Sequence, residues 1–187
     1  EAETWEYLAL TRARVAWASS PAFAARAAAA IEATLRAPRD AHRTAADVRS
    51  MRQLMARERP ASGFWDFKLV EGGLVDIEFA AQFLHLAHAA DGGPLKPNTA
   101  EALAALGDAG LVTGPTLDAL ARAWRLQQDL TQLLKVALED GADPQAEPPA
   151  FRKLLARAGA ARDFRSLRTA LAKAQAAAHA AYEAVVG

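Results

Sequence analysis

One short stretch holds most of the residues whose types and spacing could do chemistry. Two consecutive glycines, Gly72 and Gly73, come directly before an apolar run of helical spacing that begins at Leu74. A glycine pair allows a sharp turn and a close backbone approach, and the start of a helix presents unpaired N–H groups. Lys68 precedes this opening and Asp76 follows it. The pattern fits either an anion or phosphate contact at a helix N-terminus or a capped helix entry beside a surface lysine.

Two acidic residues, Asp76 and Glu78, follow the diglycine with one residue between them. On a strand this spacing would place both carboxylates on one face, but on a helix it places them on different faces. Magnesium-dependent phosphoryl transfer needs carboxylates that converge on the ion. We therefore expect neither a metal site nor a catalytic residue in this segment.

A line of polar residues continues along the same predicted helix. Glu78, Gln82 and His85 are spaced i, i+4 and i+7, so they share one face. This face either meets a partner domain or is the solvated side of the helix. His88 lies three residues after His85, close enough for both rings to touch one metal ion, but no third ligand is evident and we expect no zinc site.

Composition narrows the class of protein. The chain has 187 residues, 22 basic and 22 acidic, and it is rich in the helix formers Ala, Leu and Arg. Zero net charge argues against nucleic acid as a partner. The absence of cysteine excludes disulfides, thiolate metal sites and a cysteine nucleophile. No apolar run reaches the ~18–20 residues of a membrane span, and we expect a cytoplasmic protein. The chain does not begin with Met, which suggests a fragment of a larger protein.

Apolar spacing and breakers predict an all-α fold, a bundle of about seven or eight helices. Ser20 and Pro21, for example, are a favourable N-cap and first helical residue. We expect residues 1–187 to form a single helical domain, with a Gly/Pro/acidic linker at 140–149 before the last two helices. The expected helices cover residues 2–17, 21–36, 40–58, 74–90, 98–106, 113–139, 149–158 and 163–185.

Residues 59–73 interrupt the helical pattern. This segment contains Pro60, Gly63 and the diglycine around an aromatic run at 64–70. It predicts an aromatic-rich extended loop, either a strand that lies on the helices or an ordered loop. Core packing is the expected role of the four tryptophans, which are Trp5, Trp17, Trp65 and Trp124.

Two segments resemble the glutamine synthetase adenylyltransferase/deadenylylase family. Trp5-Glu6, followed by Ala-Leu and then Arg12-Ala-Arg14, resembles the segment that follows the family's nucleotidyltransferase core. Residues 67–79 resemble its Lys-x-Gly-x-Gly-Gly-hydrophobic-x-Asp-Ile-Glu-Phe signature. The resemblance covers about residues 3–135 and includes the segment with Asn98, Leu103, Leu106, Gly110 and Leu111.

One position departs from the signature. Val70 stands where the family usually has glycine, and Glu71 immediately precedes the diglycine. A different loop shape would change any phosphate contact that the loop makes.

The resemblance implies a large two-headed enzyme. One nucleotidyltransferase head uses ATP and magnesium to attach AMP to a tyrosine of glutamine synthetase, and the other removes it by phosphorolysis. Each head is followed by a helical domain, and the PII signalling protein and glutamine set the balance. This chain resembles the C-terminal helical domain after the adenylylating head, with no cofactor and no catalytic residue of its own. The nucleotide-interface or domain-interface candidates so implied are Lys68, Gly72, Gly73, Asp76, Glu78, Trp5, Glu6 and Arg12.

Two other interpretations remain open. PII uridylyltransferases have a similar Lys…Gly-Gly…Asp-Ile helical segment, and a stand-alone helical interaction module would share the composition. An accessory domain should expose an apolar or mixed patch on its first helix and around residues 64–78. A stand-alone module should hide its aromatic residues.

Overall fold

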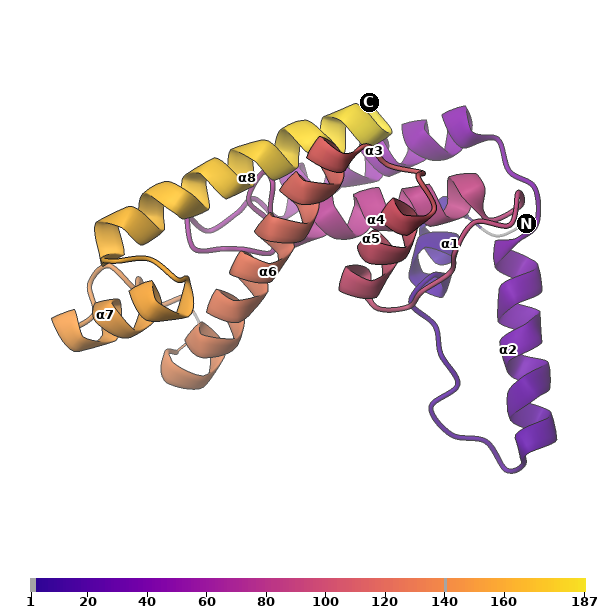
Figure 1. Ribbon diagram of the computed structural model, residues 1–187, viewed down its shortest axis with the longest axis horizontal. Coiled ribbons are helices and arrows are strands. Elements are labelled where there is room, and N and C mark those ends of the chain that lie inside the picture. Colours follow the sequence, from indigo (N-terminus) through magenta and orange to yellow (C-terminus); the bar gives the residue numbers. More distant parts are fainter. Residues whose placement is uncertain (1–2, 140) are drawn as a thin grey trace.

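The computed structural model describes residues 3–139 and 141–187, and this part of the chain holds eight helices and no strand (Figure 1). The predicted all-α bundle is confirmed. Two expected boundaries lie outside the described residues. They are Ala2, the expected start of the first helix, and Asp140, the expected start of the linker. The helices are α1 (Thr4–Leu10), α2 (Pro21–Leu35), α3 (Ala41–Glu58), α4 (Leu74–His88), α5 (Thr99–Asp108), α6 (Gly114–Ala137), α7 (Pro149–Ala158) and α8 (Phe164–Val186).

Side-chain caps fix where several helices begin. The Ser20 hydroxyl accepts a hydrogen bond from the Phe23 N–H at 3.2 Å, and a carboxylate or amide oxygen does the same at the start of α3, α5 and α8. Proline occupies the first turn of α2, α6 and α7, where its missing N–H costs no helical hydrogen bond. These local signals explain why most predicted boundaries lie within a few residues of those observed.

The first helix is much shorter than expected. We expected a helix over residues 2–17, but α1 ends at Leu10. The Thr11 hydroxyl donates to the Leu8 carbonyl at 2.6 Å, and the next two backbone N–H groups form tighter turns. A threonine that bonds to the backbone in this way competes with helix continuation.

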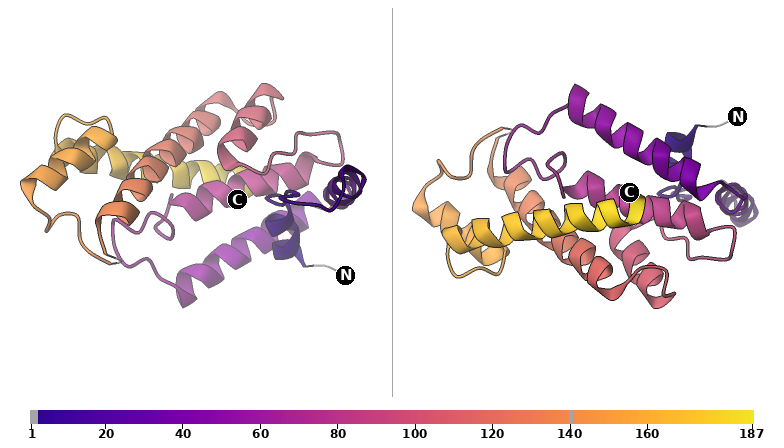
Figure 2. Two further views of the ribbon diagram at one scale, coloured as in Figure 1. Left: turned by 90° about the horizontal axis from the view of Figure 1, so that it is seen from below. Right: turned by 90° about the horizontal axis from the view of Figure 1, so that it is seen from above.

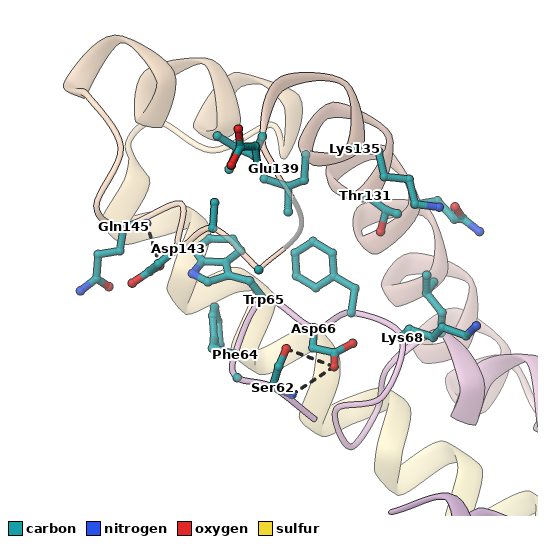
Figure 3. Close-up of a pocket in the computed structure, with 18 of the residues that line it drawn as sticks. Ser62, Phe64, Trp65, Asp66, Lys68, Thr131, Lys135, Glu139, Asp143 and Gln145 are labelled. Atoms are coloured by element: carbon teal, nitrogen blue, oxygen red, sulfur yellow. Dashed lines mark hydrogen bonds between the residues drawn. The ribbon is translucent and has the colours of Figure 1, made fainter. Parts of the chain in front are cut away.

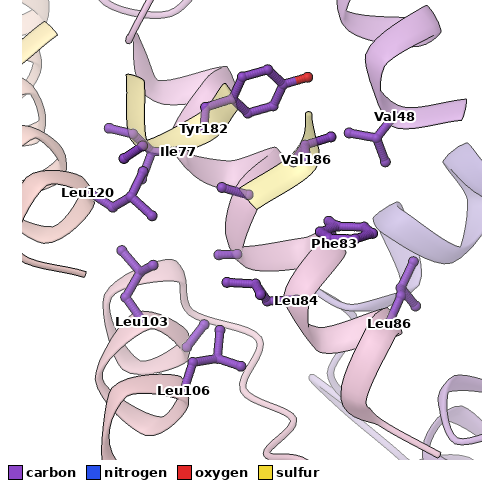
Figure 4. Packing of buried hydrophobic residues seen from close by; sticks show 14 of the residues in the cluster. Val48, Ile77, Phe83, Leu84, Leu86, Leu103, Leu106, Leu120, Tyr182 and Val186 are labelled. Atoms are coloured by element: carbon purple, nitrogen blue, oxygen red, sulfur yellow. The ribbon is translucent and has the colours of Figure 1, made fainter. Parts of the chain in front are cut away.

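Helix α4 is the centre of the bundle. It packs against α1, α3, α5, α6 and α8, and most of its side chains are buried. In Figure 4, Ile77 of α4 points toward Leu103 of α5 and Leu120 of α6, and all three are almost fully buried. Because neighbours surround α4, residues at its N-terminal end are held from several directions.

Helix α2 lies at the periphery. It projects from one end of the molecule, and α7 lies at the other end (Figures 1 and 2). Only one residue of α2 is buried, Leu35 in its last turn. The main packing partner of α2 is α1. No helix within the described ranges has the length and apolarity needed to cross a lipid bilayer.

The segment 59–73 was expected to be either a strand or an ordered loop, and it is an ordered loop. Its backbone folds through successive turns and is tied to the helix that follows, since the N–H of Leu74 donates to the Phe67 carbonyl at 2.7 Å. Trp65 packs between aromatic neighbours: its ring stacks on Phe164 of α8 at 5.6 Å and meets Phe64 edge-on at 5.2 Å. The loop is therefore a packed wall that leads directly into α4.

Candidate functional site

The diglycine brings two backbones into contact. Gly72 has φ of +69°, and a Cβ added to it would lie 1.8 Å from the carbonyl oxygen of Gln175 on α8. A Cβ on Gly73 would lie 2.6 Å from the carbonyl oxygen of Phe67. Both glycines are buried. Close approach, rather than an open phosphate-binding turn, accounts for glycine at these positions.

The carboxylate of Asp76 fills the opening of α4. Asp76 is 1% exposed, and its Oδ2 accepts a hydrogen bond from the Gly72 N–H at 2.6 Å. Its Oδ1 pairs with the Nε of Arg52 on α3, and the Nδ1 of His179 on α8 lies 3.3 Å from Oδ2. Because a buried anion already occupies this position, the geometry favours the capped helix entry over an external anion contact.

Two further side chains tie the loop to the bundle. Arg52 also donates from a terminal nitrogen to the Leu69 carbonyl at 3.1 Å. Gln127 of α6 is fully buried, and its Nε2 donates to the Gly72 carbonyl at 2.9 Å. Val70, where the family signature has glycine, does not have positive φ, so its backbone accommodates a β-branched residue. We call Arg52, Gly72, Asp76 and Gln127 the entry node.

A cleft of about 840 Å³ opens beside the entry node. Its walls are the aromatic loop, the C-terminal half of α6, and residues from 138–139 and 141–145 (Figure 3). Of the sequence candidates, it brings together Arg12, Lys68 and Glu78. The other five, Gly72, Gly73, Asp76, Trp5 and Glu6, do not line it.

Arg12 and Glu78 form an ion pair at the edge of this cleft. The Nη1 of Arg12 lies 3.2 Å from Oε1 of Glu78, with the arginine side chain 52% exposed and the glutamate 20%. Burial raises the pKa of Glu78, and the nearby charges of Arg12 and Lys68 oppose that shift. The two acidic residues thus have different partners on different faces of α4, as the helical spacing predicts.

Trp5 and Glu6 lie on the exposed side of α1. The Glu6 carboxylate accepts from the Glu3 N–H at 2.8 Å and so caps its own helix. The prediction that all four tryptophans lie in the core is wrong for two of them, since Trp5 is 58% exposed and Trp17 is 82% exposed. Trp17 is exposed because α1 ends at Leu10 and leaves it in the connection to α2.

The polar line on α4 is buried. Gln82 is 8% exposed and His85 is 2% exposed, so the prediction of a solvated face is wrong. The central position of α4 buries these two side chains, whereas Glu78 of the same line stays partly exposed. Burial lowers the pKa of His85 to about 4, and its Nε2 has no hydrogen-bond partner in the described part of the chain.

The described carboxylates and imidazoles do not suit a metal ion. Across residues 3–139 and 141–187, no three His, Asp or Glu side chains are close enough to hold one. Asp76 and Glu78 are each engaged by a separate arginine. These residues therefore do not fit magnesium.

Sequence reasoning missed the far wall of the cleft and the partners of Asp76. Lys135 comes from α6 and Arg168 from α8, and both are distant in the sequence from the aromatic loop. Arg52 and His179 meet Asp76 from α3 and α8. No local spacing signals such contacts, because they depend on how the helices pack.

Fold and site together define an all-α domain whose signature segment is a packed entry to its central helix. Residues 46–184 match a family model described as GlnD PII-uridylyltransferase, and the chain belongs to that family. Over its full length it is similar to proteins named bifunctional glutamine synthetase adenylyltransferase/adenylyl-removing enzyme. Identity is 68% with the protein of Caulobacter vibrioides, 43% with that of Xanthobacter autotrophicus and 42% with one of Rhodopseudomonas palustris. Each alignment covers all of this chain but 19% of the relative.

Proposed function

We propose that this chain is a helical accessory domain of an enzyme that adenylylates and deadenylylates glutamine synthetase. The observation that carries the proposal is the 68% identity over the whole chain to an enzyme of that name. In this proposal residues 1–187 form one domain with a linker at 140–149. The catalytic carboxylates, ATP and magnesium belong to a nucleotidyltransferase head elsewhere in a cytoplasmic polypeptide, and the chain alone transfers no AMP.

The surface of the N-terminal third supports docking onto that head. Most large apolar side chains that are exposed in the described structure lie there, namely Trp5, Trp17, Phe23 and Leu54. We call them the N-terminal patch. Exposed aromatic residues are enriched at protein interfaces. Arg14 and Arg26 lie in the same region and are exposed, which suits an acidic rim on the partner.

Loss of the N-terminal patch should weaken the complex with the head. We expect the double substitution Trp5→Ser and Trp17→Ser to reduce affinity for the purified adenylylating head at least about tenfold, because exposed tryptophans often dominate interface energetics. Calorimetry or analytical ultracentrifugation would measure it. Val136→Ser is the matched control, since Val136 is 88% exposed on α6, outside the patch. Equal affinity for both variants would rule out this docking surface.

Glutamine synthetase and PII are the proposed partners of the assembled enzyme. The alternative is a helical domain of a PII uridylyltransferase, which the description of the matching family model favours. The two differ in the acceptor: a tyrosine of glutamine synthetase receives AMP in one case, and PII receives UMP in the other. Mass spectrometry of both acceptors, incubated with the full-length enzyme and each nucleotide, distinguishes them.

A further inference from the structure

We propose that the cleft between the aromatic loop and the end of α6 binds a nucleoside phosphate within this helical chain itself. This site is separate from the nucleotidyltransferase head proposed above. The cleft's volume of about 840 Å³ lies within the range of roughly 300–1,000 Å³ that is typical of small-molecule sites. Aromatic, basic and acidic side chains all line the cleft.

The aromatic part of the wall suits a planar base. Phe64, Trp65 and Phe67 all line the cleft, but only Phe64 and Trp65 are partly exposed, since Phe67 is 4% exposed. Their rings are fixed by mutual edge-on contacts and by the stacking of Trp65 on Phe164. A rigid aromatic wall stacks a base without loss of side-chain freedom, and such stacking contributes about 1–3 kcal/mol per base.

Two lysines give one side of the cleft its positive charge. Lys68 and Lys135 lie on the same side in Figure 3, with Thr131 near them. Within the described residues, neither ammonium group forms an ion pair or hydrogen bond. Both remain available to phosphate oxygens, which bind strongly to charged donors.

Four carboxylates also line the cleft, and Glu139 lies away from the two lysines in Figure 3. Glu78 is paired with Arg12, and Asp66 accepts hydrogen bonds from Ser62 and Leu69 within its own loop. Asp143 lies on the side opposite the lysines (Figure 3). The base and the phosphates thus each meet a complementary part of the wall.

Titration calorimetry with the 187-residue chain tests the proposal, with ATP, adenosine and inorganic tripolyphosphate as probes. We expect ATP to bind saturably, and adenosine and tripolyphosphate each to bind at least about tenfold more weakly, because each lacks one half of the recognition. Absence of saturable ATP binding, or tripolyphosphate binding as tight as ATP, would overturn the proposal. Since the assay needs no catalytic head, its outcome is independent of the docking experiment.

Two pairs of variants locate the site. Lys68→Ala should weaken ATP binding about tenfold, whereas Lys153→Ala, an exposed lysine of α7 outside the cleft, should leave it unchanged. ATP should also quench tryptophan fluorescence in Trp17→Phe but much less in Trp65→Phe. Equal effects within either pair would place any bound nucleotide elsewhere and contradict the proposed cleft.

Discussion

At the residue scale, the segment with the strongest resemblance to a family signature is held by buried polar contacts. The entry node joins the aromatic loop to α3, α4 and α6 through one buried carboxylate, one arginine, one glutamine and the backbone of Gly72. Each contact satisfies a polar group that is buried, so loss of any partner leaves another group unpaired.

Gly72 should tolerate no side chain. Gly72→Ala places a Cβ 1.8 Å from the Gln175 carbonyl oxygen at φ of +69°, and we expect it to lower the free energy of unfolding by about 3 kcal/mol or more. Gly110→Ala is the matched control, because Gly110 has φ of +68° with open space around it, and should cost only about 1 kcal/mol. Urea unfolding measures both, and similar losses would contradict the close approach to α8.

The two ion pairs of α4 should differ sharply in their effect on stability. Asp76→Asn leaves Arg52 without its buried anion, and we expect a loss of about 3 kcal/mol or more. Glu78→Gln affects a pair whose arginine is half exposed, and its effect should stay within about 1 kcal/mol. Thermal and urea unfolding at pH 7 would test this. Equal effects would mean that Asp76 is not the structural anion of the helix entry.

His85 should make the fold sensitive to acid. Its folded pKa of about 4 is below the ordinary value of 6.5, so the unfolded chain takes up the proton first as the pH falls. The stability that neutral His85 contributes is present above pH 6.5 and is lost toward pH 4, by about 2–3 kcal/mol at pH 4.5. His85→Leu should remove this part of the loss between pH 7 and 4.5, whereas the exposed-site variant His42→Gln should not. Identical pH profiles for wild type and His85→Leu would refute it.

At the element scale, caps and prolines predicted where the helices lie. They did not predict which side chains are buried, because burial depends on neighbouring helices. Caps and prolines gave α2, α3, α5 and α7 nearly correct boundaries. The exposure of Trp17 follows from the early end of α1, where the Thr11 hydroxyl bonds to the Leu8 carbonyl. The burial of Gln82 depends on the helices that pack around α4. The helical spacing of apolar residues does not predict how many other helices will pack against a given helix.

Only part of the candidate site could be predicted, because the rest depends on how the helices pack. Lys68 and the diglycine stand out by type and spacing, and the aromatic loop stands out by composition. The cleft that Lys68 and the aromatic loop line also needs Lys135 from α6, which has no distinguishing local context. The part of the wall formed by Lys68 and the aromatic loop could therefore be predicted from the sequence. The part formed by α6 could not, because it depends on how the helices pack.

Helix α2 should be the least protected helix of the bundle. Its 15 residues bury only Leu35, whereas most of α4 is buried. Local opening costs little where few apolar contacts are lost. Hydrogen exchange followed by mass spectrometry should show amides in α2 exchanging at least about tenfold faster than those in α4. Addition of the nucleotidyltransferase head should slow exchange in α2 if the N-terminal patch is the docking surface. Equal protection of α2 and α4 in the free chain would contradict the peripheral role.

At the scale of the whole molecule, the chain spans 19% of the length of the relatives it matches. The central claim is that it supports chemistry performed by another part of the same enzyme. A buried entry node, an N-terminal patch and a cleft suit such a role, since no three carboxylates or imidazoles of the described residues lie close enough to hold a metal ion. Support of this kind requires contact, so its effect should appear only when the catalytic part is present.

The most direct measurement is adenylylation of glutamine synthetase by the separately expressed nucleotidyltransferase head, with ATP and magnesium, before and after addition of this chain. We predict that the chain alone transfers no AMP and that its addition raises the rate of the head severalfold in a saturable manner. A rate unchanged at saturating chain, or AMP transfer by the chain alone, would contradict the account.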